Sequence, residues 1–175
     1  TKPKPKPQKS KPSNLAGGPT VQWIWANPTT ANDRYDFRTE FQGGCKSAVL
    51  IATCDNNMTV YLNGKQVAAS TDWQAPVIVD VTKSIKEGNN QLLVKASNAG
   101  GPAGLALKLV MTMPDGKRQF VVTNKDWKIS KGDKSIQIAV LGKMGTGPWG
   151  NVFQKKPSAV QEATRNVFNV LPGFQ

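Results

Sequence analysis

Short apolar stretches, each closed by a turn signal, constrain the fold of this chain more than any other feature. Nine or ten of them follow one another at spacings of about 8–15 residues, which is typical of a β-sandwich. We predict strands at Val21–Trp25, Tyr35–Phe41, Ser47–Thr53, Thr59–Leu62, Lys65–Ala69, Val77–Val81, Gln91–Ser97, Leu105–Thr112, Gln119–Val122 and Ile136–Leu141. Asn63-Gly64 and Met113–Lys117 are turn sequences that predict hairpins. The pattern therefore indicates an all-β, antiparallel sandwich.

The composition excludes several kinds of chemistry. The 175 residues contain no histidine, which removes Ser-His-Asp catalysis, a histidine base and histidine-ligated metals. No apolar run approaches the roughly 20 residues that cross a bilayer. A glycosidase needs two facing carboxylates, and most of the 11 acidic residues lie in predicted turns, so we expect no enzyme.

The charge is concentrated at the start of the chain. Five of the 23 Lys and Arg residues lie in the first twelve positions, where Lys alternates with Pro. The other 18 against 11 acids leave +7 of the total +12, which suits an anionic partner such as an acidic polysaccharide and equally suits ordinary solubility. No nucleic-acid recognition motif is visible. We assign residues 1–19 to a disordered Lys/Pro linker, 20–152 to the sandwich and 153–175, with a possible helix at 158–169, to an extension leading to a further domain.

The two cysteines are predicted to stay unpaired. Cys45 and Cys54 flank one predicted strand, so they would lie roughly 30 Å apart at about 3.3 Å per residue. A disulfide needs Cα atoms within about 7 Å. We therefore expect two free, mostly buried thiols.

Three stretches carry a resemblance to a known family. They are Gln22–Ala26 (QWIWA), Ala52–Met111, which contains Tyr-Leu-Asn-Gly, Asp-Val-Thr and Gly-Asn-Asn, and 123–150, with KDWKIS and GTGPWG. Together they resemble the galactose-binding-like jelly-roll superfamily, and more narrowly the sugar-binding β-sandwich of bacterial α-L-rhamnosidases. The resemblance implies a jelly-roll β-sandwich that accompanies the catalytic domains of secreted, periplasmic or cell-surface proteins.

Four residues form a candidate calcium site. If the strands ending at Thr53 and Ser97 run in the same direction within one sheet, Asp55 and Asn56 meet Asn98 and the loop carbonyl of Pro102 at one edge. A carboxylate, two amide oxygens and a carbonyl are ligands that calcium takes. In the family that the chain resembles, matching positions hold a calcium ion that contacts the sugar. The alternative is a plain Asx-rich turn, with Asn98 capping its own loop.

The tryptophans divide into core and loop positions. Trp23 and Trp25 share one strand face by their spacing of two, and we expect both in the core. Trp73 and Trp149 lie in polar or Gly-Pro loops, where an aromatic ring either stacks on a sugar or packs against the loop. The candidate sugar-binding residues are therefore Trp73, Trp149, Asn98 and Asn56.

The sequence thus predicts a non-catalytic carbohydrate-binding module of a larger secreted bacterial protein. Calcium is its candidate cofactor, and other domains of the same polypeptide are expected partners. The alternative is a structural or protein-interaction sandwich that binds no sugar.

Overall fold

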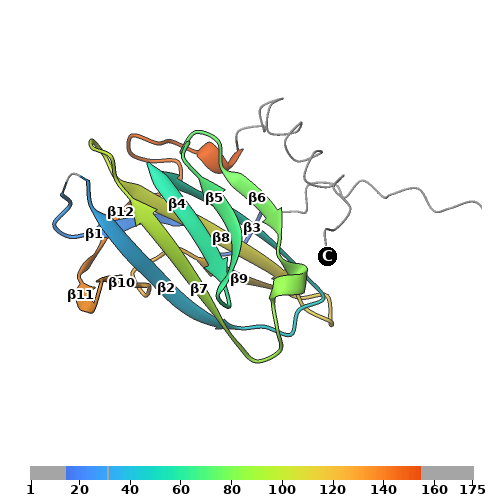
Figure 1. The fold of residues 1–175 in the computed structure, drawn as a ribbon. Coiled ribbons are helices and arrows are strands. Elements are labelled where there is room, and N and C mark those ends of the chain that lie inside the picture. The colour runs from blue at the N-terminus through green and yellow to red at the C-terminus, as the bar shows by residue number, and fades with distance from the viewer. Residues whose placement is uncertain (1–14, 31, 155–175) are drawn as a thin grey trace, which may run out of the picture.

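Two antiparallel sheets packed face to face form the fold in the computed structural model, which describes residues 15–30 and 32–154 (Figure 1). Sheet A has the strand order β12-β1-β8-β3-β6, with β9 beside β8, and sheet B has the order β11-β10-β2-β7-β4-β5. The strands are β1 (Gln22–Ala26), β2 (Arg34–Gln42), β3 (Ser47–Asp55), β4 (Asn57–Leu62), β5 (Lys65–Ser70), β6 (Val77–Asp80), β7 (Asn89–Ser97), β8 (Gly104–Thr112), β9 (Arg118–Val122), β10 (Lys128–Lys131), β11 (Lys134–Ile136) and β12 (Ile138–Lys143). Two short 3-10 helices, η1 (Thr82–Ser84) and η2 (Val152–Gln154), complete the described elements. The predicted all-β antiparallel sandwich is confirmed.

The core between the sheets follows from the alternation of side chains along each strand. We call it the inner core: it includes Leu107 and Leu109 of β8, Val94 of β7, and Trp25 with Phe37. Successive side chains of a strand point to opposite faces, so every second residue enters this layer. At roughly 25 cal/mol per Å² of buried apolar surface, this layer is the main source of stability.

A second apolar cluster lies on the other face of sheet A. This outer cluster consists of Val21, Trp23, Ala106, Val122, Trp149 and Val152. Trp23 stacks on Trp149 with ring centroids 4.4 Å apart, whereas Trp25 packs in the inner core against Phe37 at 5.3 Å. Both tryptophans are fully buried as predicted, but the prediction that they share a face is wrong. The pairing of β1 with β12 shifts register between Trp23 and Ile24, which breaks the period of two.

The same face of sheet A also carries the segment before β1. The Lys108 ammonium donates a 2.6 Å hydrogen bond to the Gly17 carbonyl, and a Cβ at Gly18 would lie 2.5 Å from the ring of Phe120. Residues 15–19, the described part of the predicted linker, therefore contact the sandwich. The described residues do not include 1–14 or 155–175. Most of the predicted extension, 153–175, and its possible helix at 158–169 therefore lie outside them.

Local predictions from turn chemistry hold where a hairpin is short. Asn63 and Gly64 have φ of 51° and 82° and join β4 to β5, as the Asn-Gly pair predicts.

The last predicted strand, Ile136–Leu141, is wrong, because residues 134–143 divide at Gln137 into β11 of sheet B and β12 of sheet A. Cys45 and Cys54 are free, as predicted, with Cys54 buried. Across residues 15–30 and 32–154, no helix has the length and apolarity that a membrane span requires.

Candidate functional site at the edge between the sheets

The candidate site forms where the chain crosses twice between the sheets. The first crossing joins β3 to β4 at Asp55–Asn57, and the second joins β7 to β8 through residues 98–103. Asp55 pairs with Gly104 in sheet A, while Asn57 pairs with Ser97 in sheet B. The two crossings therefore lie side by side.

The sequence analysis predicted that Asp55 and Asn98 lie close together, but the strand arrangement that it assumed is wrong. We expected the strands before Asp55 and before Asn98 to run in the same direction in one sheet. β3 and β7 instead belong to different sheets, and it is β4 that pairs with β7. The predicted residues still come together, because both connections cross at the same edge.

Asp55 is the buried acid of the site, with only 6 % of its surface exposed. Its Oδ2 accepts a 2.9 Å hydrogen bond from the indole N–H of Trp149, and its Oδ1 accepts a 2.7 Å bond from the Asn56 side-chain amide. Buried carboxylates require such partners, because an unpaired buried charge is costly. Each oxygen retains a lone pair beyond these bonds, so the carboxylate can still face a cation.

The two asparagines join the crossings. The Asn56 Oδ1 accepts a 2.7 Å bond from the Ala99 N–H, and the Asn98 Oδ1 accepts a 3.1 Å bond from the Gly100 N–H. Gly100 and Gly101 have φ of 120° and 70°, a backbone region open to glycine, and this lets the loop turn within a few residues. Pro102, whose carbonyl was the fourth predicted ligand, follows in the same loop and is exposed. The side-chain caps of the Asx-turn alternative are thus present as well.

A polar cluster that the sequence analysis missed supports Asn98 from the other side. The Asp33 carbonyl accepts a 2.9 Å bond from the Asn98 N–H. The carboxylate of Asp33 binds the Lys131 ammonium at 2.8 Å and the Tyr35 hydroxyl at 2.6 Å. Hydrogen bonds from Lys131 and then from Tyr35 hold the pKa of the Asp33 carboxyl below its usual value. No local pattern in the sequence announces this contact between distant residues.

The two loop tryptophans belong to the same region but differ in exposure: Trp149 is a member of the outer cluster, and Trp73 packs against that cluster. Trp149 is 6 % exposed, stacks on Trp23 and binds Asp55, so its ring faces are not available to a sugar. Of the two alternatives for Trp149, the structure favours packing within the protein, where its indole N–H also holds Asp55. Trp73 is half-buried beside the outer cluster, and its carbonyl accepts a 2.8 Å bond from the Thr53 hydroxyl. It remains the candidate aromatic contact.

The predicted ligands of the site are all oxygen donors. They comprise one carboxylate, two amide oxygens and a backbone carbonyl, all of them ligands suited to calcium. Within residues 15–30 and 32–154, no group of three or more His, Cys, Asp or Glu side chains gathers into a denser metal cluster. With a single carboxylate, the site would be a weak one unless a ligand adds donors.

The fold is that of a galactose-binding-like β-sandwich, and comparison with known proteins agrees. No protein-family model matches the chain. An α-L-rhamnosidase from Streptomyces avermitilis is 30 % identical over an alignment of 182 residues, covering 87 % of this chain and 18 % of that protein. The crystal structure of Streptomyces avermitilis α-L-rhamnosidase complexed with L-rhamnose superposes with a TM-score of 0.68 and 27 % identity, over 82 % of this chain and 17 % of that chain.

A lectin from Pleurotus ostreatus, in complex with GalNAc, shares the fold with a TM-score of 0.69 and 22 % identity, over 79 % of this chain and 46 % of that chain. The predicted resemblance to the β-sandwich of α-L-rhamnosidases is thereby confirmed. The chain spans about a fifth of the length of the rhamnosidase that it matches. That share is the size of one domain.

Proposed function

We propose that this domain is a non-catalytic carbohydrate-binding module of a larger secreted bacterial protein. The observation that carries the proposal is the edge where Asp55, Asn56 and Asn98 are brought together by two crossings between the sheets. A relative that matches most of the chain is an α-L-rhamnosidase, of which this chain covers only 18 %. The structure of the Streptomyces avermitilis enzyme was obtained with L-rhamnose, which makes this sugar the first probe.

Calcium is the proposed cofactor of this edge. Asp55, the amide oxygens of Asn56 and Asn98, and the Pro102 carbonyl would hold the ion. A bound calcium ion takes six to eight oxygen ligands, so it would offer its remaining positions to sugar hydroxyls. The residues of this chain orient the donors: Trp149 fixes one oxygen of Asp55, and the Ala99 N–H fixes Asn56.

The competing proposal is a sandwich that serves structure or protein interaction alone. The hydrogen bonds within the two crossings favour it, since they satisfy these polar groups without any ligand. The two proposals differ in one measurable way, because only a ligand-binding edge gains stability from calcium and sugar.

Calcium titration of the melting temperature tests the metal. A ligand that binds only the folded state adds about 2.7 kcal/mol at a hundredfold excess over Kd, so millimolar calcium should raise Tm. Asp55→Asn keeps the side-chain shape but removes the charge, and we expect it to abolish the shift. Asp115→Ala is the control, because Asp115 is an exposed turn residue. If calcium and chelator give the same melting curve for the unmodified protein, with and without sugar, the metal site does not exist.

Sugar binding is then measured calorimetrically with L-rhamnose and rhamnose-containing oligosaccharides, with calcium or with chelator. We expect binding that needs calcium and that Asp55→Asn removes. Trp73→Ala should weaken sugar binding and leave the calcium shift intact, because Trp73 is not among the proposed ligands. A calcium shift without binding of any sugar would favour the structural alternative.

A further inference from the structure

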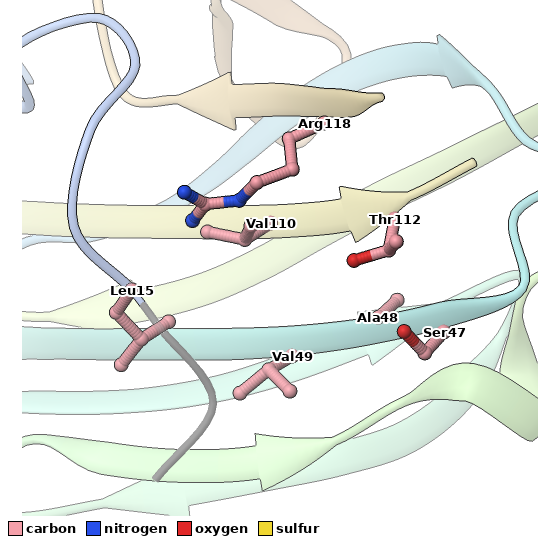
Figure 2. Close-up of a pocket in the computed structure, with 7 residues that line it drawn as sticks. All are labelled: Leu15, Ser47, Ala48, Val49, Val110, Thr112 and Arg118. Atoms are coloured by element: carbon pink, nitrogen blue, oxygen red, sulfur yellow. The ribbon is translucent and has the colours of Figure 1, made fainter. Parts of the chain in front are cut away.

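A small pocket lies on the outer face of sheet A, far from the candidate calcium site. Its walls come from β3, β8 and β9, and Leu15 closes one side from the segment before β1 (Figure 2). Ser47 lies at the opposite end of β3 from Asp55, about 26 Å away at about 3.3 Å per residue. The pocket and the calcium edge are therefore separate places on the same strand.

The strand register explains why these side chains share the pocket. Ser47 pairs with Thr112 and Val49 with Val110 across β3 and β8, and Thr112 pairs with Arg118 across β8 and β9. Paired residues of neighbouring strands present their side chains on the same face. Three adjacent strands thus place two hydroxyls and a guanidinium group beside two valines on one face of the sheet.

The size of the pocket fits a small group. Its volume is about 160 Å³. Pockets that enclose drug-sized ligands measure about 300–1,000 Å³, so this one can take a single sugar unit or one substituent rather than a long ligand.

The charge around the pocket is positive. Arg118 contributes the guanidinium, and Lys108 lies near it on the same face; burial, and then the Arg118 charge, lowers the pKa of Lys108. Both cations lie over the ring of Phe120: the Arg118 Cζ is 5.1 Å and the Lys108 Nζ 5.5 Å from the ring centroid. Among the described residues that line the pocket there is no carboxylate. Asp80 pairs with Val49 from β6, but it does not line the pocket, and its Oδ1 accepts the Thr82 N–H.

We propose that this pocket binds an anionic group, a carboxylate or a sulfate, carried by an acidic saccharide. A planar guanidinium forms paired hydrogen bonds with such groups, and the hydroxyls of Ser47 and Thr112 add donors. Val49 and Val110, which also line the pocket, offer apolar surface to the C–H groups of a sugar ring. The saccharide part of this proposal rests on the proposed function, whereas the anionic part rests on the pocket itself.

The test compares trigalacturonic acid, sulfated maltotriose and neutral maltotriose by calorimetry at 150 mM salt, with an NMR titration to locate binding. We expect one or both anionic trisaccharides to bind and to shift the amide signals of Ser47, Thr112 and Arg118, while maltotriose does not. The carboxylated or sulfated ligand that binds more tightly identifies the group. Inorganic sulfate is included, and binding of sulfate with no gain from the sugar would overturn the saccharide assignment.

Variants separate the pocket from general charge attraction. Arg118→Gln should weaken binding about tenfold or more, because it removes a charge-assisted pair, and Thr112→Val should weaken it less. Lys65→Gln, the control, removes the same charge from an exposed position at the start of β5 and should change the affinity less than about twofold. Equal losses in Arg118→Gln and Lys65→Gln, or no binding of either anionic trisaccharide, would overturn the proposal.

Asp55→Asn distinguishes this proposal from the calcium site. It should leave binding of the anionic trisaccharide intact, because the two places lie at opposite ends of β3. Loss of anionic binding in Asp55→Asn would place the ligand at the calcium edge and overturn the pocket. Anionic binding at the pocket in a protein that shows no response to calcium or rhamnose would support the pocket and contradict the proposed calcium site.

Discussion

The inner core and the outer cluster, on the two faces of sheet A, are built in different ways. The inner core is made by strands whose side chains alternate between two faces. The outer cluster combines three strand residues, Trp23, Ala106 and Val122, with Val21 before β1 and with Trp149 and Val152 from the segment after β12. Trp23 and Trp25 are two residues apart in β1, yet each belongs to a different cluster.

This difference separates the stability of the fold from the geometry of the site. The inner core contains no residue of the candidate calcium site, whereas Trp149 of the outer cluster binds Asp55 directly. Changes in the inner core should therefore affect the whole fold. Changes in the outer cluster should affect the site at a smaller cost in stability.

The two cysteines should show the largest difference, in the rate at which their thiols react, because Cys54 lies in the inner core and Cys45 at its margin. Cys54 is fully buried and Cys45 is half-buried, and burial raises the pKa of both thiols, that of Cys54 more strongly. We expect Cys45 to react with a thiol reagent in the folded protein, and Cys54 to react at least about a thousandfold more slowly, since it needs the core to open. Mass spectrometry of the labelled protein measures both rates. Both thiols should react after denaturation without reduction, and an intramolecular disulfide would contradict the strand assignment.

Trp25→Ala should cause the largest loss of stability, about 3–5 kcal/mol, because removal of the indole ring leaves a cavity in the inner core. The Trp25 ring packs on Tyr35 and Phe37 with centroids 5.8 and 5.3 Å away. Chemical denaturation measures the loss. Trp25→Phe is the matched variant and should cost less, because it also removes an indole N–H that has no hydrogen-bond partner within the described residues. Equal losses would show that packing does not dominate here.

Trp149→Phe should cost about 1.5–3 kcal/mol, because it removes a hydrogen bond to the buried carboxylate of Asp55 and keeps an aromatic ring against Trp23. Trp127→Phe is the control. It removes a 2.9 Å bond to the neutral carbonyl of Val122 and should cost about 0.5–1.5 kcal/mol. If calcium binds at the edge, only Trp149→Phe should also weaken the calcium shift, since only Trp149 positions a proposed ligand. A shift unchanged in Trp149→Phe would remove the positioning role.

The sequence predicts the inner core well because strand alternation and turn chemistry are local. Asn63-Gly64 determines its hairpin within two residues, and the continuous apolar run of β3 marks a central strand. The outer cluster could not be predicted, because it depends on a register shift in β1 and on a distant segment folding back over sheet A. The division of 134–143 between two sheets was missed for the same reason, since no local signal tells which sheet a short strand joins.

The candidate site was predicted in its residues but not in its construction. Runs of Asp and Asn at the ends of strands are visible in the sequence, and they are the residues that meet at the edge. The contacts of Trp149 with Asp55 and of Asp33 with Asn98 join residues 94 and 65 positions apart. Pairing over such separations is a property of the folded topology and leaves no periodic trace.

Gly18→Ala tests the segment that covers the face of sheet A beside the outer cluster. Gly18 has a φ of +77°, and a Cβ there would lie 2.5 Å from the ring of Phe120. Gly88→Ala is the control, because Gly88 has a φ of +78° with nothing within 4 Å. The control should cost about 1–2 kcal/mol for the left-handed backbone alone, and Gly18→Ala should cost more in thermal or chemical denaturation. Equal costs would mean that the segment lifts away from Phe120 without loss.

Removal of residues 1–13 should have the smallest effect and leave Tm nearly unchanged. These residues form most of the predicted Lys/Pro spacer, and residues 1–13 have no apolar side chain except prolines to bury. Removal of residues 1–18 should lower Tm, because it also deletes Leu15 and the Gly17 carbonyl that accepts a hydrogen bond from the Lys108 ammonium. Lys108 is buried, so its charge would lose that partner. Differential scanning calorimetry of the two truncations compares them directly. A drop of several degrees already in the shorter truncation would place part of 1–13 on the sandwich, and the boundary of the folded domain would then move toward the start of the chain.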